Sequence, residues 1–296
     1  MKHKSQKKQW KILLIGLFVL TIIGGCASPP TAKPPGSYTT TASDGTSIRY
    51  DVAGQGETAL LFVHCWTCNR SFWDHQFDYF SEHYRVVRLD LAAHGESGQS
   101  RTEYTMASFG ADVATVAEAL DLNQIILIGH SMGGPVSVEA SKILGDRVAG
   151  VVGVDTFYTG FPYPQDDAGI QAFTQPFVDN FHETSAGMVR SMFPASTDKK
   201  IVDKVLAVTQ AAHQEMAISA MIDIFHWNRD EGPQALKALG NKLHNINGEP
   251  MNKDVPPHPS VRKIANTGHF PLMEKPHEFN QALTDIVNEL LHPGAQ

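Results

Sequence analysis

Residues 125–134, with the sequence IILIGHSMGG, limit the possible folds of this chain more than any other stretch. Four apolar residues, three of them β-branched, predict a buried parallel strand, and the residues after Ser131 predict a helix that ends at Gly145. Glycines flank Ser131, as expected at a sharp turn from strand to helix, because a Cβ there would collide with neighbouring backbone. Such a turn lifts the Ser131 hydroxyl out of the sheet and places N–H groups where they stabilise negative charge.

Strands and helices alternate on both sides of this stretch. Further strands are predicted at 38–41, 47–52, 59–63, 84–91, 148–155, 243–246 and 260–265. Helices are predicted at 106–120 and 276–291. This alternation predicts an α/β fold, in which a mostly parallel sheet is covered by helices on both faces.

Residues 156–239 follow a different pattern, with helical periodicity, many Phe and Met residues, and interrupting prolines. We predict that they form a helical cap inserted between two strands of the sheet. Some of its apolar residues are expected to pack in a core, and others to roof the site over Ser131. The candidates are Phe161, Phe173, Phe177, Phe181, Met188, Met192, Phe193, Met216, Met221, Phe225 and Trp227.

The N-terminus has the pattern of an export signal. Residues 1–25 contain five Lys and no acidic residue, and their apolar run, 12–25, is too short to span a bilayer. The run ends at Cys26 and resembles a bacterial lipoprotein signal, which implies that Cys26 carries acyl chains anchoring the protein to a membrane of the cell envelope. A cleaved signal with an incidental cysteine is the alternative. The Pro-rich residues 26–37 predict a disordered tether before a domain at 38–291.

The charge balance argues against nucleic acid as a partner. The 296 residues have a net charge of −7, and the remainder is more acidic once the lysine-rich signal is set aside. With 42% hydrophobic and 19% charged residues, the composition is that of an ordinary globular domain. The oligomeric state has no signature in the sequence.

Four motifs occur in a characteristic order: His64 after a strand, DLAAHGES at 90–97, the serine turn at 129–133, and GHFPLMEKP at 268–276. With them, the chain resembles the α/β-hydrolase fold family over residues 38–291. It is most similar to small capped esterases near the haloalkane dehalogenases and C–C hydrolases, but with serine as nucleophile. A dehalogenase or epoxide hydrolase would need a carboxylate in place of Ser131. The resemblance implies no metal and no cofactor.

The family pattern also assigns catalytic residues. A serine hydroxyl needs a base because it is almost fully protonated at neutral pH, and His269 is the base that the pattern supplies. The acid has two candidate positions. We prefer Asp155, 24 residues after Ser131 at the end of a predicted strand. Asp254 is the alternative, since Met251 occupies the slot that usually holds Asp.

The resemblance further implies an oxyanion hole formed by the backbone N–H groups of Trp66 and Met132. Cys65 stands where the family usually has glycine, which leaves the Cys65 N–H as an alternative donor to that of Trp66. Cys65 and Cys68 also form a Cys-x-x-Cys motif, but neither further metal ligands nor a thioredoxin-like setting is evident. The pair is expected as packed thiols or as a local disulfide in an oxidising compartment.

The sequence therefore predicts an exported, lipid-anchored serine hydrolase of carboxylesterase type. Its substrate would be a small to medium hydrophobic ester, cleaved through an acyl-enzyme under an apolar roof. A C–C-bond hydrolase or a perhydrolase with the same triad is one alternative. A noncatalytic lipoprotein that binds a hydrophobic ligand is the alternative from another class.

Overall fold

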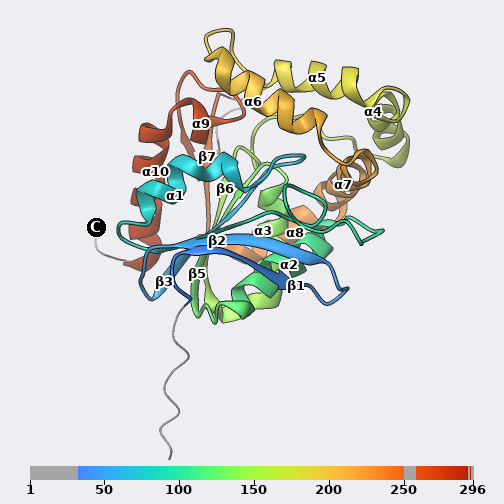
Figure 1. Ribbon diagram of the computed structural model, residues 1–296. Helices are drawn as coiled ribbons and strands as arrows, with labels where there is room; N and C mark the ends of the chain where they lie inside the picture. The colour runs from blue at the N-terminus through green and yellow to red at the C-terminus, as the bar shows by residue number, and fades with distance from the viewer. Residues whose placement is uncertain (1–32, 250–257, 293, 295–296) are drawn as a thin grey trace, which may run out of the picture. The chain divides into compact units, whose positions relative to one another are not determined.

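A computed structural model of the chain describes residues 33–249, 258–292 and 294 (Figure 1). The predicted signal, the predicted lipidation site Cys26, most of the predicted tether, and Asp254 lie outside the described residues. Among the residues that are described, no helix combines the length and the apolar character needed to cross a membrane.

The described strands form one eight-stranded sheet in the order β1-β2-β4-β3-β5-β6-β7-β8. They are β1 (Gly36–Thr41), β2 (Ser47–Ala53), β3 (Thr58–Val63), β4 (Arg85–Leu89), β5 (Gln124–His130), β6 (Val148–Val154), β7 (Leu243–Asn247) and β8 (Val261–Lys263). β2 pairs antiparallel with β1 and with β4, whereas all pairs from β4 to β8 are parallel. The predicted mostly parallel α/β sheet is confirmed.

Helices cover both faces of this sheet (Figure 1). One face packs against α2 (Met106–Ala119), α3 (Gly133–Leu144) and α8 (Gly232–Leu239). The other packs against α1 (Asp74–Phe80), α9 (Pro271–Glu274) and α10 (Pro276–Leu291). Successive residues of β3 serve the two cores in turn: Leu61 joins the α2 and α3 side, and Leu60 and Phe62 join the α1 and α10 side.

Some boundaries differ from the prediction. β1 begins at Gly36, and β4 ends at Leu89. The carboxylate of the next residue, Asp90, accepts the backbone N–H groups of Arg70 and Glu96. Helix α1 and the preceding 3₁₀ turn η1 (Arg70–Trp73) were not predicted, because elements this short show too little periodicity. Two more 3₁₀ turns, η2 (Gly145–Arg147) and η4 (Gly240–Lys242), precede β6 and β7.

The segment between β6 and β7 is helical, as predicted, and its helices α4 to α6 lie above the sheet in the view of Figure 1. It comprises α4 (Asp167–Asp179), α5 (Phe181–Ser191), α6 (Lys199–Gln210), α7 (Gln214–His226), the π-helical turn η3 (Trp227–Glu231) and α8. α4 contacts α5 and α7, and α5 contacts α6, whereas α8 contacts α3. The end of the predicted cap segment, α8, therefore packs with the sheet layer, and we call α4 to α7 the cap.

Candidate active site

Ser131 lies in the predicted sharp turn between β5 and α3. Its φ of 52° is in the left-handed region, which is rare for a residue other than glycine and marks local strain. The turn is held on both sides, because the Ser131 N–H donates to Val154 O at 2.9 Å and Ser131 O accepts from the Gly134 N–H at 2.8 Å. A Cβ on Gly129 would lie 2.0 Å from the Gly133 carbonyl oxygen. The close approach therefore requires glycine there, as predicted.

Asp155 and His269 meet beside this turn. His269 Nδ1–H donates to Asp155 Oδ2 at 2.6 Å, and Asp155 Oδ1 accepts from the Gly248 N–H at 2.9 Å. Asp155 follows β6 directly, and its φ of 44° is again left-handed. Both side chains line the same cavity as Ser131. With Nδ1 protonated toward Asp155, His269 Nε2 is left as the proton acceptor of the ring.

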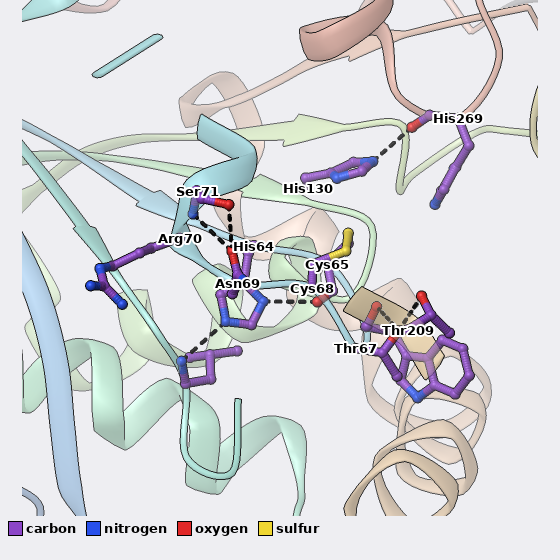
Figure 2. The surroundings of a disulfide bond; sticks show 12 residues. His64, Cys65, Thr67, Cys68, Asn69, Arg70, Ser71, His130, Thr209 and His269 are labelled. Atoms are coloured by element: carbon purple, nitrogen blue, oxygen red, sulfur yellow. Dashed lines mark hydrogen bonds between the residues drawn. A yellow bond between two sulfur atoms is a disulfide. The ribbon is translucent and has the colours of Figure 1, made fainter. Parts of the chain in front are cut away.

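The backbone of His269 is fixed from two directions. Its N–H donates to Met192 O, just after cap helix α5, at 2.9 Å, and its carbonyl accepts from His130 Nε2 at 2.7 Å (Figure 2). Burial, together with the neighbouring His269, holds the pKa of His130 well below its usual value, so this ring is neutral. A Cβ on Gly268 would lie 2.1 Å from Met192 O, which explains the glycine before His269.

A cavity of about 320 Å³ opens above Ser131 and is mostly apolar. Its residues from the cap and the loop before it are Thr159, Phe161, Tyr163, Phe173, Met188, Ser191, Met192, Met221, Ile224 and Phe225. The expected apolar roof is confirmed for part of the candidate set. Phe177 and Phe181 instead pack against the Trp66 ring. Trp227 is buried and donates to Glu139 on α3.

Tyr163 is a polar residue of the cavity that the sequence analysis missed. It precedes α4 in a segment without a motif, so only the tertiary structure brings it to the site. Burial, with the nearby Asp155 carboxylate, raises the pKa of Tyr163, so its hydroxyl stays neutral and remains a hydrogen-bond donor.

Trp66 and Met132, the predicted oxyanion donors, both line the cavity beside Ser131. Within the described part of the chain, neither backbone N–H donates to a protein acceptor. Cys65 lies on the wall of a smaller adjoining cavity and not on that of the large one. Trp66, Ser131 and His269 line that smaller cavity as well.

The loop that carries Trp66 is anchored at its start by His64. The fully buried ring accepts from the Leu91 N–H at Nε2, at 3.1 Å, and donates from Nδ1 to Cys65 O, at 2.8 Å (Figure 2). Burial lowers the pKa of His64 to about 4, so the ring is neutral and keeps one donor and one acceptor. The prediction that His64 supports this loop through hydrogen bonds is confirmed.

Arg70 anchors the other end of the loop. Its guanidinium pairs with Asp90, with Asp51 at 3.0 Å and with Glu96 at 2.6 Å, and its N–H donates to Asp90 Oδ1 at 2.7 Å. Burial opposes the charge, but the three carboxylates together hold the pKa of Arg70 above its usual value. Asp90 is fully buried, so this pairing leaves no uncompensated charge under the site.

Between these anchors, Cys65 and Cys68 form a disulfide. This is one of the two states that the sequence left open for the pair.

Comparisons with known proteins bear on this arrangement. The sequence profile of the alpha/beta hydrolase fold matches residues 58–214. The chain is 43% identical over 98 residues to a non-heme chloroperoxidase of Streptomyces lividans, covering 32% of this chain and 36% of that one. It is 26% identical over 253 residues to the dihydrolipoyllysine-residue acetyltransferase component of an acetoin cleaving system of Cupriavidus necator, covering 81% and 66%. The matches thus span less than two thirds of either relative.

A solved structure gives wider coverage. The thermophilic esterase from Thermogutta terrifontis superposes with a TM-score of 0.72, over 87% of this chain and 99% of that one, at 23% identity. At this identity the likeness concerns the fold alone. It confirms the predicted architecture of a mostly parallel sheet with helices on both sides.

Proposed function

The chain belongs to the α/β hydrolase fold family, and we propose that it is a serine hydrolase that cleaves a carboxylic ester of a small to medium hydrophobic substrate. The observation that carries this proposal is the 2.6 Å hydrogen bond from His269 Nδ1 to Asp155 Oδ2, on the wall of the cavity that Ser131 also lines. An oriented imidazole next to a strained serine is the arrangement that activates a hydroxyl nucleophile.

In the proposed mechanism, Ser131 Oγ attacks the ester carbonyl while His269 Nε2 takes its proton. Asp155 stabilises the imidazolium that forms and holds the ring in the correct tautomer. His269 then returns the proton to the leaving alcohol, and water cleaves the acyl-enzyme by the same base catalysis. Ser131 and His269 share a cavity but no hydrogen bond in the described structure, a looseness common before substrate is bound.

In this proposal, the N–H groups of Trp66 and Met132 stabilise the negative charge that develops on the substrate oxygen. Donors that are already in place stabilise a developing oxyanion without reorganisation, which is often the largest single contribution to catalysis. Among the described residues neither N–H has a protein acceptor, and both residues line the cavity with Ser131, which supports this assignment. The apolar cap side chains favour an uncharged hydrophobic substrate, and Met188 and Met221 allow variation in its shape.

A second candidate is perhydrolysis, in which hydrogen peroxide replaces water on the same acyl-enzyme. The local 43% identity to a non-heme chloroperoxidase is the observation that favours it. Both candidates need the same nucleophile, so they differ only in what attacks the acyl group.

The test is hydrolysis of a p-nitrophenyl ester series, from acetate to long acyl chains, by the full-length chain and by Ser131→Ala. We expect activity on hydrophobic esters, and a loss of about 10⁵-fold or more in kcat for the variant. Adding peroxide with a carboxylic acid and measuring peracid tests the second candidate. An aryl phosphonate should label Ser131 covalently, because labelling needs an activated nucleophile. A folded protein that neither turns over any ester nor reacts with the phosphonate would be a binding protein.

A further inference from the structure

A covalent bond and a backbone hydrogen bond both close the turn that carries Trp66. A disulfide joins Cys65 and Cys68, whose Cα atoms lie 5.2 Å apart, and the Cys68 N–H donates to Cys65 O at 3.1 Å (Figure 2). Both cysteines are buried. The disulfide also walls the small cavity that Ser131 and His269 line, so it lies next to the reacting groups.

These bonds set the direction of the peptide between Cys65 and Trp66. Its carbonyl oxygen accepts two hydrogen bonds, from the Cys68 N–H and from His64 Nδ1. In a trans peptide the carbonyl and the N–H point in opposite directions. The Trp66 N–H therefore points away from His64, and Trp66 shares the cavity wall with Ser131. Whatever holds the Cys65 carbonyl also aims the Trp66 N–H.

Thr67 completes the turn in a conformation that needs such support. Its φ of 56° is unfavourable for a β-branched residue. Its hydroxyl donates to Trp66 O at 2.7 Å and lies 3.1 Å from the Thr209 hydroxyl on α6 (Figure 2). The Trp66 indole donates to Ala217 O on α7 at 2.7 Å. The cap therefore holds the side chains of the turn, and the disulfide holds its backbone.

We propose that the Cys65–Cys68 disulfide is a positioning element for catalysis, which holds the turn so that the Trp66 N–H meets the oxyanion formed at Ser131. This inference rests on the proposed function. Without the disulfide, only hydrogen bonds hold the Cys65 carbonyl and Thr67. The peptide before Trp66 can then move away from the direction that the oxyanion requires. This movement weakens stabilisation of the transition state, because the oxyanion exists only there. It leaves substrate binding in the apolar cavity unchanged.

The first test uses the full-length variants Cys65→Ala, Cys68→Ala and the double variant. Each removes the same link, so all three should lose kcat by the same factor, about 10- to 100-fold, with KM within twofold. A trifluoromethyl ketone, which forms a tetrahedral adduct at a serine, should bind more weakly by the factor lost in kcat/KM. An unreactive ether analogue of the substrate should bind as it does to the wild type.

The second test uses the wild-type chain and does not depend on how the variants fold. Dithiothreitol gives two hydrogens to the disulfide and becomes a cyclic disulfide, leaving two thiols that iodoacetamide alkylates for detection by mass spectrometry. Reduction should lower kcat as the variants do, and removing the reductant under air, without iodoacetamide, should restore it. Circular dichroism should show the same fold before and after reduction.

Three results would overturn the inference while the proposed function stands. One is an unchanged kcat in the reduced enzyme. Another is a fold-loss in the double variant that equals the product of the two single-variant losses, as independent packing effects would give. The third is unfolding on reduction, which would make the disulfide a support of the whole fold. An oxidised wild type that hydrolyses no ester would instead refute the proposed function itself.

Discussion

The two walls of the cavity are built by different forces. On the sheet wall, Ser131, Asp155 and His269 follow strands or enter turns, and hydrogen bonds to backbone or to buried side chains hold each of them. The cap wall, formed by the cap and the loop before it, consists mainly of rings and thioethers. Examples are Phe161 and Phe225, whose rings stack with centroids 6.3 Å apart. Hydrogen bonds fix the position of an atom, whereas apolar contacts fix only the area removed from water.

This difference separates two tasks. Catalysis requires reacting atoms that are held within a fraction of an ångström, so the catalytic residues are expected on the sheet wall. Substrate selectivity tolerates variable packing, so the residues that determine it are expected on the cap wall. The two walls meet at His269, whose N–H is held by Met192 O at the end of the cap helix α5. Substitutions on the sheet wall should therefore lower kcat, whereas substitutions on the cap wall should change substrate selectivity.

The largest effect is expected from Asp155→Asn on the sheet wall. The amide cannot hold His269 in the correct tautomer or stabilise its charge, so kcat should fall by about 10⁴-fold with the fold intact. Steady-state kinetics on the best ester measure this. Asp254→Asn is the matched control and should retain activity within about twofold. A collapse of Asp254→Asn with an active Asp155→Asn would assign the acid to the other residue.

A cap substitution should change selectivity more than rate. Met221→Ala enlarges the cavity, so the ratio of kcat/KM for long to short acyl esters should rise by about tenfold. Ile222→Ala, on the same helix but not on the cavity wall, is the control and should leave the ratio unchanged. Equal losses on all esters in Met221→Ala would mean that the cap also positions the reacting groups.

A third effect, on the stability of the fold and not on catalysis, is expected in acid from the buried histidines His64, His94 and His130. Burial lowers the pKa of His64 to about 4 and that of His94 to about 3, and it lowers that of His130 as well. Unfolded histidines titrate near 6.5, so the unfolded state takes up protons first as the pH falls. Stability should decline from about pH 6.5 to about pH 4, by about 1.4 kcal/mol per pH unit for each such histidine.

Urea unfolding midpoints between pH 4 and 7.5 measure this decline. His94→Gln removes one of the three groups and should make the slope shallower, whereas His277→Gln, on the surface of α10, should not. A flat profile would show that these rings take up protons at the same pH in the folded and unfolded states.

Much of the fold follows from local patterns in the sequence. The run IILI before Ser131 predicted a buried strand, and the glycines around Ser131 predicted a tight turn, because both properties depend on near neighbours. The alternation of strands and helices then limited the sheet to a mostly parallel one. The candidate nucleophile and base stood in motifs at strand ends, so they were also visible.

The sequence by itself therefore determined the α/β core, the turn at Ser131, and the candidates His269 and Asp155. Only the tertiary structure decided that Asp155 meets His269, that Cys65 and Cys68 are joined, and which cap residues face the cavity. The physical reason is the distance along the chain over which each property is set. Strand and turn conformations are set by residues a few positions apart. Whether an apolar cap residue faces the core or the cavity depends on helices far away in the sequence. The residue itself does not decide this, because an apolar side chain packs equally well in either place.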